Sequence, residues 1–108
     1  MTISHCQKEN KLVFQIVGKL DTITAPSLEV YLQEHLRFGT GAVVFDLSEL
    51  EYIASAGLRL LLLSAKKAKA AGETVILHNA NVAVLQVLTI AGFTPLFHIH
   101  SNHDTSAS

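Results

Sequence analysis

The sequence predicts a single α/β domain built on a mainly parallel or mixed sheet. Segments rich in β-branched and aromatic residues alternate along the chain with segments of helical spacing, which is typical of strands connected by helices. Residues 42–45 form a continuous apolar run, as expected of a strand covered on both faces. Of the 108 residues, 49% are hydrophobic and 16% are charged, so the chain can bury one core but has no room for two.

The first half of the chain is expected to form two strands, a helix and a third strand. The strand at 12–17 ends in a turn at Gly18. Hydroxyl residues before Pro26 predict a capped helix start, and leucines at every fourth position give this helix one apolar face as far as Phe38. The expected strands of this half are 3–6, 12–17 and 42–45, the last of them ended by Asp46.

The second half is expected to add two helices and two strands. Leucines and alanines at helical spacing predict a long helix from Ala56 that ends at Gly72. The segment around Asn81 offers a cap for the last helix, which Gly92 and Pro95 bound. That helix is expected to pack Val84, Leu85 and Leu88, and the strands are expected at 74–78 and 96–99.

Charge and composition exclude several functional classes. Eight basic and nine acidic residues give a net charge of -1, the opposite of a nucleic-acid-binding surface. No apolar run approaches the ~18 residues of a membrane span, and no secretory signal is expected, so we predict a cytoplasmic protein. The single cysteine, Cys6, excludes an internal disulfide. We expect one domain over 1–100 and a polar, flexible tail over 101–108.

The connection at 46–59 carries the most functional information, because function in such sheets gathers at the carboxyl ends of strands. Ser55 stands where the N-cap of the long helix belongs. In the structural interpretation its hydroxyl accepts a backbone hydrogen bond, worth about 0.5–2 kcal/mol relative to alanine. In the functional interpretation, a second protein phosphorylates Ser55. The small neighbours Ala54, Ala56 and Gly57 leave the hydroxyl open to that protein's active site, and the N-terminus of the helix stabilises the phosphate.

Three motifs with their spacing carry a resemblance that covers nearly the whole chain. They are Gly18-Lys19-Leu20-Asp21 followed by Thr24-Ala25, Asp46-Leu47-Ser48, and Tyr52-Ile53-Ala54-Ser55-Ala56-Gly57-Leu58. Together they resemble the STAS domain of bacterial anti-sigma factor antagonists. The resemblance implies a mixed sheet with helices largely on one side, and a partner that is an anti-sigma factor with a serine kinase fold.

The resemblance also implies a phosphorylation switch without enzymatic activity or cofactor. Ser55 corresponds to the family's phosphoacceptor, whose phosphorylation releases the antagonist until a serine phosphatase restores it. The unphosphorylated protein binds the kinase and displaces the sigma factor. Where family members often have an acidic residue and sometimes a second serine, this chain has Ala54 and Ala56. The implied partner-binding residues are Asp21, Thr24, Ser48, Ser55, Ala56, Gly57 and Arg59.

Two alternatives stay open. The domain could be a constitutive docking subunit of a sensory or lipid-transport assembly, with Ser55 only a cap. It could also be a hydrolase, because Ser55-Ala56-Gly57 matches the second half of a nucleophile elbow. Ile53 occupies the first glycine position of that motif and is better interpreted as a core residue.

The remaining candidate ligands give no site. His98 and His100 share one face of a strand and precede His103, but neither a second cysteine nor a helical histidine pair completes a tetrahedral set, so we expect no metal. The other histidines are expected to be scattered. Cys6 is expected to face the core, and Asp46 to brace the loop that follows it.

Overall fold

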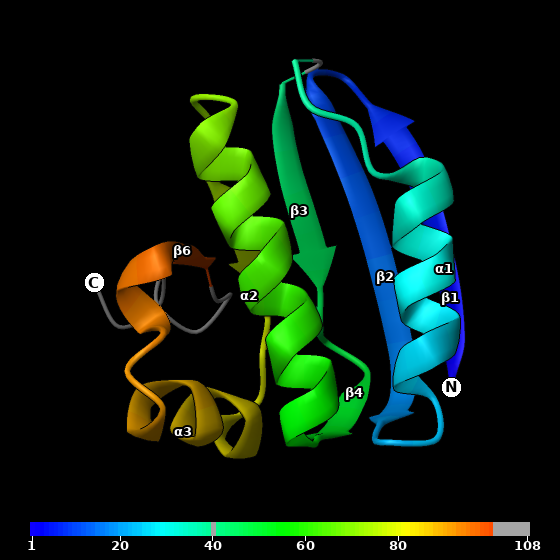
Figure 1. The fold of residues 1–108 in the computed structure, drawn as a ribbon, viewed down its shortest axis with the longest axis vertical. Helices are drawn as coiled ribbons and strands as arrows, with labels where there is room; N and C mark the ends of the chain where they lie inside the picture. The colour runs from blue at the N-terminus through cyan, green and yellow to red at the C-terminus, as the bar shows by residue number, and fades with distance from the viewer. Residues whose placement is uncertain (40, 101–108) are drawn as a thin grey trace.

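The computed structural model describes residues 1–39 and 41–100, which form a six-stranded sheet with helices against one face (Figure 1). Five strands lie in the order β1-β2-β3-β5-β6, and β4 pairs with the end of β2. The elements are β1 (Thr2–Lys8), β2 (Lys11–Leu20), α1 (Ala25–His35), β3 (Ala42–Asp46), β4 (Leu50–Ile53), α2 (Ser55–Ala70), β5 (Val75–His78), α3 (Val82–Ile90), a 3-10 turn (Thr94–Leu96) and β6 (Phe97–His100).

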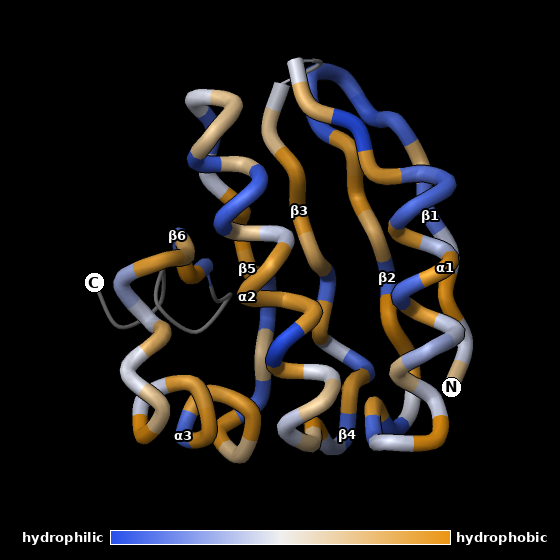
Figure 2. The backbone as a smooth tube through the Cα atoms, viewed as in Figure 1, coloured by the Kyte–Doolittle hydropathy of each residue, from blue (hydrophilic) through white to orange (hydrophobic). Residues whose placement is uncertain are grey.

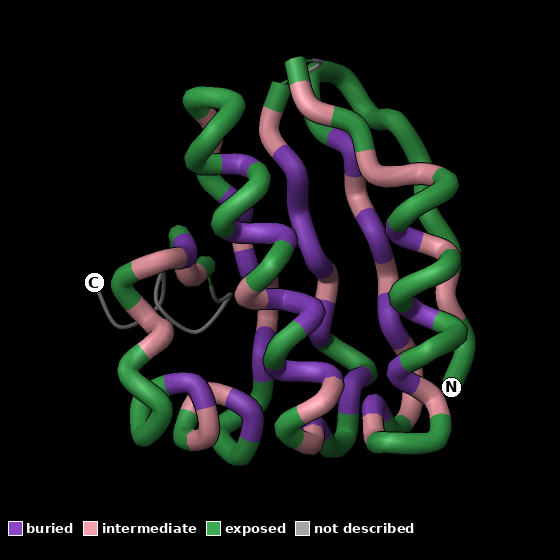
Figure 3. Tube along the Cα trace, viewed as in Figure 1, coloured by how far each residue is buried: buried purple, intermediate pink, exposed green. Residues whose placement is uncertain are grey.

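The sheet is mixed and mainly parallel, as the sequence predicts. Only the β1–β2 pair is antiparallel among the described strands, whereas β2–β3, β2–β4, β3–β5 and β5–β6 are parallel. Helices α1 and α2 lie against the same face (Figure 1). On β2 this face carries Leu12, Phe14 and Ile16, all buried, while Val13 and Gln15 on the opposite face are half-buried. Buried residues therefore gather where strands meet helices (Figure 3).

Hydropathy explains why the sheet holds the core. The strands β2 and β3 are apolar over much of their length, whereas the helices alternate between apolar and polar residues (Figure 2). Phe14 and Phe45 stack at the centre with ring centroids 5.6 Å apart. No helix in the described ranges is long and apolar enough to cross a membrane.

Helix ends follow the predicted signals in the second half of the chain. Gly72 ends α2 with a positive φ of 77°, which lets the Glu73 N–H donate to the Ala68 carbonyl at 2.8 Å. Asn81 caps α3, because its side chain accepts a hydrogen bond from the Val84 N–H at 2.8 Å. The predicted tail, 101–108, lies outside the described residues.

Several predicted boundaries were wrong. β2 does not end at Gly18 but continues to Leu20, since Gly18 has a φ of 99° and the register shifts there, which lets the strand bend and pair with β4. The connection at 46–59 contains the strand β4, which the sequence did not reveal because its buried residues do not alternate. α1 ends at His35 rather than at Phe38, although Phe38 still packs against the core.

Candidate functional site

Two parallel strands place Asp21 beside Ser55. Asp21 follows the last residue of β2, and Ser55 comes two residues after the last residue of β4. The register pairs Leu20 with Ile53, and the Ala54 N–H donates to the Leu20 carbonyl at 2.8 Å. Because neighbouring strands run about 4.8 Å apart, the two segments leave the sheet side by side at one edge.

Gly57 allows α2 to start this close to β2. A Cβ at Gly57 would lie 2.3 Å from Cγ of Leu20, a side chain that is fully buried. Real carbon atoms do not approach so closely, so a larger residue would push the start of α2 away from β2. Gly57, which the resemblance places in the partner-binding set, therefore has a packing role in the structure.

Asp21 and Thr24 close the loop between β2 and α1 with reciprocal hydrogen bonds. The Asp21 carboxylate accepts from the N–H groups of Ile23 and Thr24 at 3.0 and 2.9 Å, and the Thr24 hydroxyl accepts from the Asp21 N–H at 2.9 Å. This reciprocal pattern is that of a capping box. The predicted hydroxyl cap at the start of α1 was wrong in detail, because Thr24 makes no side-chain cap bond to α1 and bonds Asp21 instead.

These contacts favour the charged form of Asp21. The backbone N–H of Thr24 has the largest effect and lowers the pKa of the Asp21 carboxyl. Desolvation, the second-largest effect, raises this pKa, whereas the Thr24 hydroxyl and the Ile23 N–H lower it, and the net shift is downward. The hydroxyl proton of Thr24 has three acceptors within reach: the Lys19 carbonyl at 2.9 Å, the Asp21 carboxylate at 3.1 Å and the Asp21 carbonyl at 3.4 Å. Asp21 thus presents a fixed negative charge at this edge.

Ser55 is not an N-cap, contrary to the structural interpretation. The N-cap is Ala54, whose carbonyl accepts from the Leu58 N–H at 2.9 Å, and Ser55 is the first helical residue. The Ser55 side chain is exposed and makes no hydrogen bond with any other residue in the described ranges. Its hydroxyl is therefore available to another molecule, beside the positive end of the helix dipole.

The other predicted site residues divide into two groups. Arg59 is exposed one helical turn after Ser55 and on the same side of α2, whereas Ala56 is half-buried against the core. Ser48 precedes β4, and Ser55 follows it, so the length of β4, about 10 Å, separates them. The structure places Asp21 and Thr24 next to the start of α2, which contains Ser55, Ala56, Gly57 and Arg59, and it places Ser48 before the other end of β4.

Two exposed apolar side chains at this edge were missed from the sequence. Ile23, at the tip of the loop closed by Asp21 and Thr24, is 86% exposed, and Tyr52 on β4 is 51% exposed. Ile23 stands between two threonines in a turn, which is an unusual place for a large apolar residue and could have drawn attention to it.

Other expectations were tested by the fold. Asp46 braces the following loop, as predicted, by accepting from the Ser48 N–H at 3.1 Å, and Ile53 is buried. Cys6 does not face the core: its side chain is exposed on the opposite face of β1, because the register with β2 places it beside Val13.

The histidines are not scattered. His5 contacts Tyr31 and His35 of α1, with the two imidazole centroids 4.4 Å apart. His98 and His100 lie on one face of β6, as predicted, with their ring centroids 5.2 Å apart. Within 1–39 and 41–100 no three potential ligands are grouped so as to hold a metal ion. His103 lies outside the described residues.

The mixed sheet, with helices on one face and a serine at the start of α2, defines a STAS-type domain. The chain belongs to the STAS domain family, whose model matches residues 3–106. It is 31% identical over 100 residues to BtrV of Bordetella bronchiseptica, assigned as an anti-sigma factor antagonist, a match covering 93% of this chain and 86% of that protein.

Solved structures of similar fold include antagonists from two further sources. An anti-sigma factor antagonist from Mycobacterium paratuberculosis is 26% identical, with a TM-score of 0.77 over 92% of this chain and 84% of that one. The phosphorylated form of SpoIIAA, a Bacillus cell fate determinant, is 16% identical, with a TM-score of 0.70 over 98% of this chain and 97% of that one. The latter similarity shows the fold alone.

Proposed function

We propose that this protein is a cytoplasmic anti-sigma factor antagonist, controlled by phosphorylation of Ser55. In the unphosphorylated form it binds an anti-sigma factor serine kinase and displaces the sigma factor. The binding residues are Asp21, Thr24, Ser48, Ser55, Ala56, Gly57 and Arg59. Phosphorylation by the kinase releases the protein, and a serine phosphatase returns it to the binding form. The chain itself catalyses no reaction in this cycle.

The observation that carries this proposal is the free hydroxyl of Ser55. It is exposed, lacks a hydrogen-bond partner among the described residues, and lies between the small residues Ala54 and Ala56. A serine that served only as a cap would use its hydroxyl on the helix. The names of the relatives support the antagonist role, and SpoIIAA, of the same fold, has a phosphorylated form.

Charge explains how phosphate at Ser55 would release a partner. A phosphoserine adds a charge of about -1.5 to -2 at neutral pH. The added charge lies at the start of α2, so the helix dipole stabilises it and the helix stays folded. It also lies at the same edge of the sheet as the Asp21 carboxylate and the exposed side chains of Ile23 and Tyr52, so an interface that fits the neutral serine would meet an added negative charge.

The test compares four forms of the chain: wild type, Ser55→Ala, Ser55→Asp and Thr74→Asp. Thr74 is exposed and lies just before the amino end of β5, whereas Ser55 lies beyond the carboxyl end of β4. Its substitution by aspartate therefore adds the same charge away from the site. Each form is used to capture partners from an extract of the native cells, and the captured proteins and the Ser55 peptide are identified by mass spectrometry.

A kinase-type anti-sigma factor should bind wild type, Ser55→Ala and Thr74→Asp but not Ser55→Asp. Incubation of the complex with ATP should add one phosphate to wild type, at Ser55, and none to Ser55→Ala. Equal binding of Ser55→Asp to a partner of another kind, with Ser55 never phosphorylated, would contradict the switch and favour the constitutive docking subunit.

A further inference from the structure

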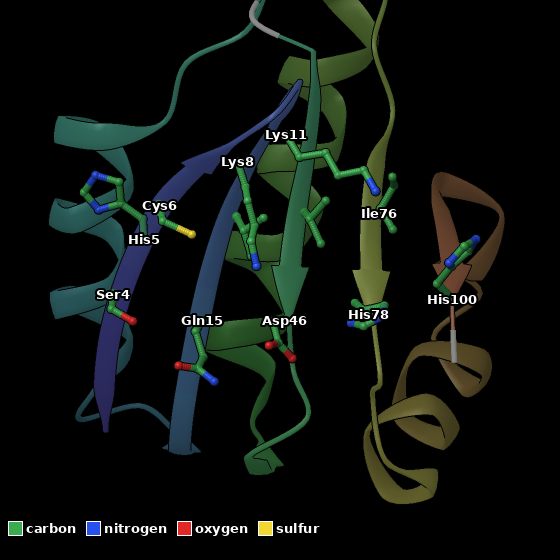
Figure 4. A pocket seen from close by; sticks show the side chains of 12 residues that line it. Ser4, His5, Cys6, Lys8, Lys11, Gln15, Asp46, Ile76, His78 and His100 are labelled. Carbon is green, nitrogen blue, oxygen red and sulfur yellow. The ribbon is translucent and has the colours of Figure 1, made fainter. Parts of the chain in front are cut away.

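The sheet face that α1 and α2 leave uncovered has an ordered arrangement of side chains (Figure 4). Strand register places residues in rows that cross the sheet. The central row is apolar and consists of Cys6, Val13, Val44 and Ile76, and it ends at His98. A polar row on one side consists of Ser4, Gln15, Asp46, His78 and His100.

On the other side of the apolar row, Lys8 and Lys11 are directly opposed across the β1–β2 hairpin. Both are exposed, and neither ammonium group forms an ion pair or hydrogen bond with the described residues. Like charges directly opposite each other destabilise an antiparallel pair. Both side chains extend over the sheet, and Lys11 reaches across β3 toward Ile76 (Figure 4). The two ammonium groups point apart, and an anion that lies over the sheet between them would be attracted by both (Figure 4).

The rows line a depression of about 500 Å³, which reaches from β1 to β6 and includes both lysines. This volume lies within the range of small-molecule sites, which combine an apolar lining with a few placed polar groups. The apolar row crosses four strands and is about 14 Å long at a strand spacing of about 4.8 Å. Asp46, on the far side of that row, would repel a second negative charge.

We propose that this open sheet face binds a small amphipathic anion. Its negatively charged head lies between Lys8 and Lys11, and its unbranched apolar body lies along the row from Cys6 to Ile76. The ligand class is a monoanion of the medium-chain carboxylate type. This site is on the face opposite α2, and the inference does not depend on the phosphorylation of Ser55.

The test uses Cys6 as a reporter, because it is the single cysteine, is exposed and lies in the apolar row. Alkylation of Cys6 by the neutral reagent iodoacetamide is followed by intact mass, with and without decanoate below its micelle concentration. The variants are Lys8→Gln/Lys11→Gln and, as a matched control, Lys66→Gln/Lys67→Gln on the exposed side of α2. Decyltrimethylammonium is the control ligand of equal chain length and opposite charge.

Decanoate should slow the alkylation of Cys6 in wild type and in the α2 control. Loss of two exposed ion pairs should weaken that protection about tenfold in Lys8→Gln/Lys11→Gln. Equal protection in the two double variants, equal protection by the cationic control ligand, or no protection at all would overturn the proposal.

A second measurement does not depend on the variants. Decanoate titrated into wild-type protein should shift the amide NMR signals of Val13, Val44 and Ile76, which lie in the apolar row. Shifts confined to other parts of the domain would overturn the proposed location.

Discussion

Substitution of Gly57 by alanine tests the packing that holds Ser55 beside Asp21. The added Cβ would lie 2.3 Å from Cγ and 2.7 Å from one Cδ of Leu20. Favourable carbon contacts lie at about 3.5–4.0 Å, so the two elements must separate by more than about 1 Å. Leu20 is fully buried and comes just before the loop that Asp21 closes, so it cannot move aside into solvent.

Two opposing effects set the size of the change. Overpacking of a filled core costs about 1–3 kcal/mol. Alanine gains up to about 1 kcal/mol over glycine as a helical residue. We therefore expect Gly57→Ala to lower the free energy of unfolding by about 1–2 kcal/mol, or the melting temperature by about 5–15 °C in a domain of this size.

A double-mutant cycle assigns the cost to the contact with Leu20. Urea denaturation is followed by circular dichroism for Gly57→Ala, Leu20→Ala and the double variant. Leu20→Ala alone should cost about 2–5 kcal/mol, and the cavity that it leaves should accept the new methyl group. The cost of Gly57→Ala should then fall by about 1–3 kcal/mol in the Leu20→Ala background. An equal cost in both backgrounds, or a more stable Gly57→Ala protein, would refute the packing argument.

Two further predictions follow from the hydrogen bonds. Ser55→Ala should change the free energy of unfolding by less than about 0.5 kcal/mol, whereas Asn81→Ala should cost about 1–2 kcal/mol, because Asn81 caps α3 and also donates to the Leu50 carbonyl at 2.9 Å. Equal losses in urea denaturation would show that Ser55 is a cap. Because the folded-state pKa of Asp21 lies below its ordinary value of 3.8, its ionised form stabilises the fold above that pH, and this contribution is lost as the pH falls through the lowered pKa. The stability difference between wild type and Asp21→Asn should therefore shrink on acidification in pH-dependent urea denaturation, and a constant difference would contradict the capping-box assignment.

Short-range chemistry made the helix ends predictable from the sequence. The αL glycine after α2 and the Asn81 cap depend on residues within one helical turn of each helix end. Ser55 was located correctly at the start of α2 for the same reason. Only the interpretation of Ser55 as the cap was wrong. A cap and a first helical residue differ by one position, and the hydrogen bond from the Ala54 N–H to the Leu20 carbonyl fixes that position.

The strand β4 and the site beside it depend on pairing between distant segments. Both Glu51 and Tyr52 of β4 are exposed, so the strand has no alternation of apolar and polar residues for a sequence pattern to detect. β4 forms because β2 bends at Gly18, and the next residues of β2, Lys19 and Leu20, then pair with β4. The adjacency of Asp21 and Ser55 is a consequence of that pairing.

The sequence by itself determined the α/β class, the element order apart from β4, and the STAS resemblance, since these follow from periodicity, local caps and motif spacing. Only the tertiary structure decided which face of the edge strand β1 carries Cys6, because both faces of that strand are largely exposed and give no burial pattern. Register with β2 makes that choice, and it also sets Lys8 against Lys11. Hydrogen bonding between strands is a non-local interaction. It therefore determines both the free hydroxyl of Ser55 at one edge and the opposed Lys8 and Lys11 on the open face.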